Sequence, residues 1–220
     1  MTKSNNFITC HPDAGFLQVA GPDAAPFLQS ILTSNVETLA VGACRPSALL
    51  TPQGRVLIDM MLYRPTDHTF ILRTDAGRRD DLFAKLRRYR LRRPVELLID
   101  NDLRLAIYLG DMPLDTTLQP IAYKDPRGTG LGHHILFRHI DDLVRFAAQN
   151  TIENIDETGQ LIGEWQQRRI AAAAHYWAWC WCHCHRGQTH CNAWGPNGVA
   201  TCTAEKSGGP RVASVCWGQA

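Results

Sequence analysis

A change in composition near residue 172 limits what this chain can fold into more than any other feature. From Ala171 onward come six of the eight cysteines, five of the six tryptophans and four of the nine histidines of the 220 residues. The residues before this point have the mixed composition of an ordinary globular protein. We therefore treat residues 1–172 and 173–220 as two regions, and we predict that the second region, called the tail, is disordered.

The composition excludes several classes of protein. The chain is 45% hydrophobic, which is enough for a buried core. Its formal net charge of +2 is too small to indicate nucleic acid or an anionic membrane as a partner. There is no run of about 20 apolar residues and no apolar segment of a signal peptide near the start. We expect a cytoplasmic protein with neither kind of partner.

Two cysteines, Cys10 and Cys44, precede the tail. They provide no disulfide framework, and this suits a reducing compartment. We expect both to be inert thiols.

Strand and helix patterns alternate irregularly before residue 172. Thr51–Gly54 places Pro and Gly where a turn between two strands needs them. Strands are predicted at 16–20, 47–50, 55–63, 70–73, 95–99, 103–109 and 135–137. Helices are predicted after Asp23 and at 79–89, 141–149 and 156–173, with Leu82, Phe83, Leu86 and Tyr89 facing inward from the second. This order favours an α+β fold built on antiparallel sheet.

Four stretches carry a resemblance to a known family. They are 21–29 with 33–36, 48–56 with Asp59, 89–92, and 125–127 with 131–132. In this order they resemble the folate-binding YgfZ family, whose relatives include the glycine-cleavage T-protein, an aminomethyltransferase. The resemblance covers about residues 7 to 172. It implies a T-protein-like fold around a tetrahydrofolate pocket, lacking the C-terminal β-barrel, and a bacterial cytoplasmic location, with the mitochondrial matrix as the alternative.

The resemblance also implies a function and partners. The chain is expected to be a tetrahydrofolate-binding accessory protein for iron–sulfur cluster assembly or repair, with assembly proteins or client iron–sulfur enzymes as partners. A first alternative is a folate-dependent aminomethyltransferase of the glycine cleavage type. A second is a metal-binding module in the tail.

Three residues are assigned to folate binding by this resemblance. They are Asp59 and Arg55 of the hairpin stretch and Arg169 of the last helix, where Arg168 is the alternative. The first acid of the family's acidic pair is replaced here by Ile58, so a carboxylate pair for proton handling is missing. We therefore assign no catalytic residue. Asp59 could instead bond only to neighbouring backbone.

Two other clusters have ordinary interpretations. The five arginines at positions 87, 88, 90, 92 and 93 could hold phosphate or carboxylate groups. A solvated helix end, favoured by the helix dipole, is the preferred interpretation. His133, His134 and His139 are interpreted as surface or core histidines.

The tail carries Cys180, Cys182 and Cys184 beside His183 and His185. These residue types bind zinc or copper, but their alternating spacing matches no zinc fold, so we assign no metal. The family's Lys-Gly-Cys signature is absent as written. Regrouped from the third base of each codon, however, residues 210–214 permit Lys-Gly-Cys-Phe. We therefore hypothesise a single-base slip near residues 172–174.

Resequencing the DNA across codons 165 to 220 tests this hypothesis. We expect a missing or additional base, after which the restored frame reads Lys-Gly-Cys-Phe. An intact frame would show that the tail is genuine protein, and its zinc content would then be measured with and without changes to Cys180, Cys182 and Cys184. The chain as written should be poorly soluble, because truncation exposes apolar sheet surface.

Overall fold

The structure, a computed structural model, describes residues 6–110, 113–115, 120, 122–128, 130–163 and 165–169, and the backbone of three short strands beyond them. The chain divides into two compact units, Met1–Ala171 and Ala172–Ala220. Among the described residues, no helix is long and apolar enough to cross a membrane.

The described residues of the second unit form three strands. They are β11 (Thr189–Asn192), β12 (Thr201–Ala204) and β13 (Arg211–Val212), paired antiparallel in that order. Cys180, Cys182 and Cys184 lie outside the described residues, as do His183 and His185. The hypotheses about a metal and about the reading frame therefore stay predictions.

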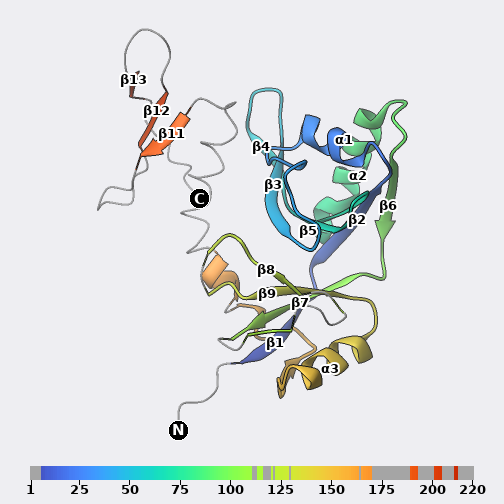
Figure 1. Ribbon diagram of the computed structural model, residues 1–220, viewed down its shortest axis with the longest axis vertical. Coiled ribbons are helices and arrows are strands. Elements are labelled where there is room, and N and C mark those ends of the chain that lie inside the picture. The colour runs from blue at the N-terminus through green and yellow to red at the C-terminus, as the bar shows by residue number, and fades with distance from the viewer. Residues whose placement is uncertain are drawn as a thin grey trace. The chain divides into compact units, whose positions relative to one another are not determined.

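The described residues of the first unit form two five-stranded sheets. Figure 1 shows how the two sheets and their helices are arranged. Sheet 1 is antiparallel throughout, in the order β3-β4-β5-β2-β6. Its strands are β2 (Ala14–Ala20), β3 (Cys44–Leu50), β4 (Val56–Thr66), β5 (Thr69–Asp75) and β6 (Glu96–Asp100). Two helices, α1 (Ala24–Ile31) and α2 (Ala76–Arg90), belong to its outer layer.

Sheet 2 has the order β10-β1-β7-β9-β8. Its strands are β1 (Phe7–His11), β7 (Arg104–Leu109), β8 (Ala122–Lys124), β9 (His133–Phe137) and β10 (Asn154–Asp156). The β1–β10 pair is parallel and the other pairs are antiparallel. The amphipathic helix α3 (Ile140–Gln149) packs Leu143, Phe146 and Ala147 on one face of this sheet.

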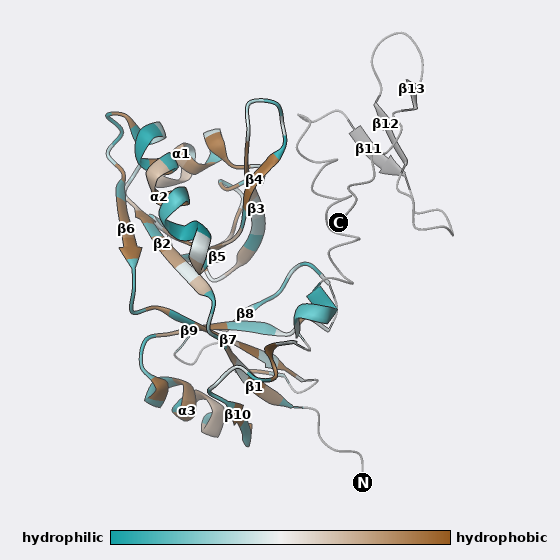
Figure 2. Ribbon diagram, turned by 180° about the vertical axis from the view of Figure 1, so that it is seen from behind, coloured by the Kyte–Doolittle hydropathy of each residue, from teal (hydrophilic) through white to brown (hydrophobic). Residues whose placement is uncertain are grey.

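Successive side chains of a strand point to opposite faces of its sheet, and this alternation separates the layers. On β4, Ile58, Met60 and Leu62 pack with α1 and α2, whereas Met61 and Tyr63 pack against residues of sheet 2. The layers are thus α1 with α2, sheet 1, sheet 2 and α3. Figure 2 shows brown, apolar segments on the strands and teal, polar segments on α2. The predicted α+β fold with antiparallel sheets is confirmed.

The hairpin between β3 and β4 matches its predicted turn. The Thr51 N–H donates to the Arg55 carbonyl at 2.8 Å, and the Gly54 N–H donates to the Thr51 carbonyl at 2.9 Å. Gly54 adopts φ +81°, a conformation that glycine reaches without a Cβ clash. The turn sequence therefore helps to fix the register in which β3 and β4 pair.

The predicted helix over 156–173 is wrong at its start. Residues 154–156 form β10, and helix occurs at 162–163 and 165–169. The Asp156 carboxylate accepts hydrogen bonds from the Thr9 hydroxyl, the Gly159 N–H and the Leu161 N–H. Because it satisfies backbone groups of this turn, helical hydrogen bonding starts only after it.

Three further predictions differ from the structure. Strands β1 and β8 were not predicted, because each is short and lies in a polar or loop-rich context. Tyr89 was predicted to face inward but is 48% exposed. Leu82 and Leu86 are fully buried, and Tyr89 lies one turn beyond this last core contact of α2.

Two glycines with similar backbone angles allow a matched stability test. A Cβ on Gly132 (φ +72°) would lie 1.8 Å from the Tyr108 carbonyl oxygen, whereas a Cβ on Gly130 (φ +83°) would meet nothing within 4 Å. We expect Gly130→Ala to cost about 1 kcal/mol through its positive φ. Gly132→Ala should cost about 3 kcal/mol or more. Urea denaturation measures both, and equal losses would contradict the close approach.

Candidate functional site

Trp165 lies at the centre of a polar cluster between the two sheets. Its side chain is fully buried, and its indole N–H donates to the Leu131 carbonyl at 3.2 Å. The rings of His11 and His134 meet it edge-on, with centroid distances of 5.6 and 5.9 Å. We call the following set the Trp165 cluster: His11, Tyr63, Arg73, Asp125, Arg127, His134, Trp165 and Arg169.

Three guanidinium groups surround the indole ring. The Cζ atoms of Arg73, Arg127 and Arg169 lie 5.8, 5.6 and 5.4 Å from its centroid. At these distances the electron-rich face of a tryptophan attracts cations by about 0.5–2 kcal/mol, more when water is excluded. Trp165 thus holds together three like charges that would otherwise repel one another.

Asp125 anchors one side of the cluster. Its carboxylate is 2.5 Å from a terminal nitrogen of Arg127 and 3.0 Å from His134 Nε2. His134 Nδ1 lies 2.7 Å from the Tyr63 hydroxyl. With Nε2 protonated and near the carboxylate, Nδ1 accepts the hydroxyl proton, so Tyr63, His134 and Asp125 lie in one continuous row of polar contacts across the two sheets.

Arg73 occupies the other side. It projects from β5, is 4% exposed, and directs one terminal nitrogen to His11 Nε2 at 2.9 Å. This contact requires a neutral His11 with its proton on Nδ1. Arg73 Nε and His11 Nδ1 are buried and have no hydrogen-bond partner among the described residues. Buried polar atoms normally have partners, so these two atoms are a place where a ligand could bond.

Burial and hydrogen bonding move the pKa values of the cluster's titratable groups away from neutrality. Burial lowers the pKa of His134 to about 4 and that of His11 to about 3. Burial raises the pKa of Tyr63 well above its usual range, whereas hydrogen bonds from Arg127 and His134 lower the pKa of Asp125 despite its burial. A general acid or base needs a pKa near the working pH, and none of these four groups has one.

The two cysteines near the sheets are also unreactive. Burial raises the pKa of Cys44 to about 12 and that of Cys10 to about 11. Cys44 donates to the Lys124 carbonyl at 3.2 Å. Since the thiolate is the nucleophilic form, both thiols are inert at neutral pH. No group of three or more metal-ligand side chains occurs among the described residues.

The charge balance of the cluster favours an anionic ligand. Three guanidinium groups face one carboxylate, and the two histidines are neutral, which leaves an excess of two positive charges. Arg169 is partly exposed and lies on the last described helical turn. Guanidinium groups bind carboxylates and phosphates in bidentate geometry. The arrangement can therefore bind and orient an anion at the Arg169 side.

The structure brings one of the three predicted binding residues into this cluster. Arg169 contacts Trp165 as described. Asp59 lies on β4 on the same face as Met61 and Tyr63, but its side chain is exposed, and its carbonyl accepts from the Thr74 hydroxyl at 2.9 Å. It therefore lies at the solvent-exposed end of the face that carries Tyr63.

Arg55 lies outside the cluster. It is exposed in the turn before β4, and its N–H donates to the Thr51 hydroxyl at 3.2 Å. Among the described contacts, none joins Arg55 or Asp59 to Arg169. Ile58 is 2% exposed and packs in the opposite core, so its position presents no group to the Trp165 cluster.

Most members of the cluster were not predicted as site residues. Asp125 and Arg127 had been noted as part of a motif, and His134 as a surface or core histidine. The available signal was a charged residue next to core positions: Arg73 directly follows the apolar run Phe70, Ile71 and Leu72. His11 and Trp165 lie 154 positions apart in sequence, and only the fold reveals their contact.

The chain is similar in sequence to iron–sulfur cluster assembly factors and to aminomethyltransferases. Residues 13–104 match the family described as the GCVT N-terminal domain. The chain is 32% identical over 151 residues to "Iron-sulfur cluster assembly factor IBA57 homolog, mitochondrial" of Chaetomium globosum, and 33% identical over 141 residues to the Homo sapiens protein of that type. Each alignment covers 54% of this chain, but only 35% and 40% of the two relatives. The matched part thus spans less than half the length of these relatives.

Aminomethyltransferases are also similar. That of Corynebacterium jeikeium is 33% identical over 72 residues, which are 33% of this chain and 18% of that protein. The crystal structure of glycine cleavage system aminomethyltransferase T from Bartonella henselae matches 72% of this chain and 49% of its own with a TM-score of 0.55 at 19% identity. This likeness confirms the predicted T-protein-like fold.

The predicted bacterial cytoplasmic location is wrong. The assembly factors from Chaetomium globosum, Neurospora crassa, Homo sapiens and Mus musculus that the chain resembles are named as mitochondrial. The prediction relied on the family resemblance and on the absence of an apolar leader, which distinguishes secretion but not this compartment; the mitochondrial matrix was the stated alternative.

The two buried histidines predict a particular dependence of stability on pH. Each has a folded pKa below that of the unfolded chain, so the unfolded state binds more protons and stability falls as pH drops from 6.5 toward 4. The slope should reach up to about 1.4 kcal/mol per pH unit for each histidine. Urea denaturation between pH 6.5 and 5, above the range where carboxylates titrate, measures it.

His134→Gln should remove part of this slope and leave the rest, because His11 remains buried and the pKa of the half-buried His133 is also lowered by burial. The matched control is His68→Gln, because His68 is exposed in the turn between β4 and β5. An unchanged slope in His134→Gln would contradict the neutral state assigned to His134.

Proposed function

We propose that residues 1–172 are the folate-binding region of a YgfZ-type accessory protein for iron–sulfur cluster assembly. The observation that carries this proposal is the similarity, over 141 to 151 residues, to proteins named as iron–sulfur cluster assembly factors. Assembly proteins or client iron–sulfur enzymes are the proposed partners, and the mitochondrial compartment of these relatives is the proposed location.

The residues present fit a folate. A folate offers carboxylates at its glutamate end and N–H donors on its pterin ring. Arg169 and Arg127 provide guanidinium groups for the carboxylates, and Arg73 Nε is a buried donor without a partner among the described residues. Asp59 offers an exposed carboxylate to N–H donors from the same face of β4. These residues would hold the ligand, which would supply its one-carbon chemistry.

The protonation states favour an accessory role over catalysis. His134 and Tyr63 keep their protons fixed near neutral pH, because burial moves the two pKa values away from 7 in opposite directions. Neither residue is therefore suited to general acid or base catalysis. We propose that the Trp165 cluster binds and orients its ligand without transferring protons.

A folate-dependent aminomethyltransferase is the second candidate function. The shared fold and the 33% identity over 72 residues to the Corynebacterium jeikeium aminomethyltransferase favour it. Ile58 weighs against it, since this position is apolar and buried in the core beside α1 and α2. The two candidates differ in turnover: an aminomethyltransferase would form methylenetetrahydrofolate from an aminomethyl donor and tetrahydrofolate, whereas an accessory protein would bind folate without turnover.

Calorimetric titration with 5-formyltetrahydrofolate tests the folate proposal. We expect saturable binding, weakened about tenfold or more by Arg169→Gln, which removes one charge-assisted hydrogen-bond donor worth about 1.5–3 kcal/mol. Asp59→Asn should weaken binding less, because the asparagine amide keeps one acceptor oxygen. Arg145→Gln, on the exposed face of α3, is the matched control and should bind like the parent.

Absence of binding by a folded parent chain would overturn the folate proposal. Equal affinities for the Arg169 and Arg145 variants would instead place the ligand away from the Trp165 cluster. Fluorescence of the buried Trp165 cannot replace calorimetry, since the chain contains six tryptophans.

A further inference from the structure

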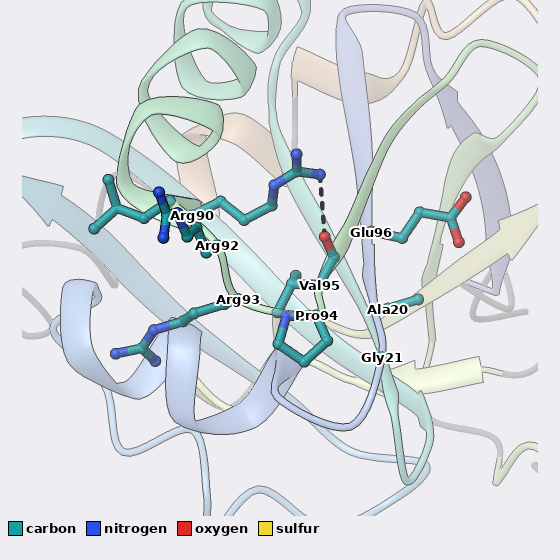
Figure 3. Close-up of a pocket in the computed structure, with 9 residues that line it drawn as sticks. Ala20, Gly21, Arg90, Arg92, Arg93, Pro94, Val95 and Glu96 are labelled. Carbon is teal, nitrogen blue, oxygen red and sulfur yellow. Dashed lines mark hydrogen bonds between the residues drawn. The ribbon is translucent and has the colours of Figure 1, made fainter.

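An open pocket lies where α2 ends and the chain turns toward β6. It has a volume of about 580 Å³ and is lined by Ala20, Gly21 and residues 90–96. Figure 3 shows Arg92 and Arg93 on one side of the pocket and Glu96 on the other. We call residues 90–96 the arginine loop.

The arginine loop is held in one conformation. The Arg90 guanidinium donates to the Val95 carbonyl at 3.2 Å, drawn as the dashed line in Figure 3. Val95 is buried in the core with α1 and α2. Gly21 (φ +123°) approaches so closely that a Cβ would lie 2.5 Å from the Pro94 carbonyl oxygen. A loop fixed at three points loses little conformational entropy when it binds a partner.

Four arginines around this pocket form no salt bridge among the described residues. Arg87, Arg88, Arg92 and Arg93 are exposed, and none takes part in the salt bridges found among the described residues. A helix C-terminus accounts for one or two cations through its dipole. Arg92 and Arg93 lie beyond the end of α2, however, so the dipole leaves them unexplained.

Leu91 is the second unusual feature of the loop. It is 81% exposed and adopts φ +52°, ψ −117°, a conformation that a non-glycine residue takes only at a cost in free energy. Glycine would remove both the strain and the exposed apolar surface. Tyr89, 48% exposed, lies two residues before it. Tyrosine and arginine are enriched at the energetic centres of protein interfaces, and the exposed Leu91 adds apolar contact surface beside them.

We propose that the arginine loop is a docking site for an acidic segment of a partner protein. Carboxylates of the segment pair with Arg92, Arg93 and the last turn of α2, and an apolar side chain packs on Leu91. Single-stranded nucleic acid is disfavoured, because Tyr89 alone would provide a stacking surface in this set. The proposal does not depend on folate binding.

The arginine loop and the Trp165 cluster lie on different sides of sheet 1, so both can be occupied at the same time. Leu82 and Leu86 of α2 pack on the face of sheet 1 that carries Ile58, Met60 and Leu62. The Trp165 cluster lies on the opposite face, which carries Tyr63. A partner on the arginine loop therefore leaves access to Arg169 unchanged.

Fluorescence anisotropy of the full chain with a labelled peptide tests the proposal. The peptide has a central Leu flanked by Glu and Asp, and its control has Gln and Asn in their place. We expect the acidic peptide to bind at least tenfold more tightly at low salt, and its affinity to fall as salt rises. Equal affinity for the two peptides, or no binding by the folded chain, would overturn the proposal.

Two variants locate the site. Arg92→Glu with Arg93→Glu should weaken binding of the acidic peptide at least tenfold. Arg78→Glu with Arg104→Glu changes the net charge by the same amount at exposed positions elsewhere, and should weaken it less than threefold. Equal losses in the two double variants would show that the peptide responds only to net charge and would contradict a defined site.

Leu91→Gly separates the apolar contact from stability. Glycine relieves the positive φ, so this variant should fold at least as stably as the parent while binding the peptide several-fold more weakly. Unchanged affinity would contradict the contact with Leu91. A single-stranded oligodeoxynucleotide that binds the parent more tightly than the acidic peptide would overturn the assignment to a protein partner.

Discussion

Burial of Trp165 among cations is the interaction on which the first unit depends. Three guanidinium groups, two of them largely or fully removed from water, lie within 6 Å of its ring centroid. Burying a charge costs several kcal/mol unless other groups compensate for it. Here the compensation comes from the indole face, from the Asp125 carboxylate and from two histidines that stay neutral. Without the Trp165 ring, the repulsion among the three guanidinium groups would no longer be offset.

The cluster also places a polar group of residues inside the mainly apolar interface between the two sheets. Tyr63 and Arg73 come from sheet 1, and His11 and His134 come from sheet 2. An apolar interface would be more stable and would tolerate sliding of one sheet on the other. Directional hydrogen bonds across the interface permit one register instead. The polar contacts therefore reduce the stability of this interface somewhat, and in return they fix the arrangement around Arg169.

The sequence predicted best where local chemistry decides the structure. Pro52 and Gly54 determine a turn, and alternation in 55–63 determines a strand, so the hairpin was predictable from about twenty residues. The sequence predicted less well where side chains far apart in the chain bond to each other. Asp156 binds Thr9, which is 147 positions away, and the short strand β10 depends on that pairing.

The same difference between local and long-range contacts applies to the Trp165 cluster. Arg169 was reached through a family resemblance, whereas Arg73 and His11 meet only because β5 and β1 belong to facing sheets. Single charged residues in apolar strands indicate that a buried partner exists, without identifying it. Asp59 and Arg55 were placed correctly on the hairpin, yet their relation to Arg169 depends on packing that periodicity does not encode.

The strand order has a consequence for how the chain folds during synthesis. All strands of sheet 1 come from residues 14–100, a continuous segment that can pair as soon as it has left the ribosome. Sheet 2 is different: β1 at residues 7–11 pairs with β7 at 104–109 and with β10 at 154–156. β1 is therefore synthesised first, but one of its edges stays unpaired until β10, the last strand of this sheet, has been synthesised. Sheet 1 can keep β1 close to its final position during this interval, because β2 belongs to sheet 1 and follows β1 after only two residues.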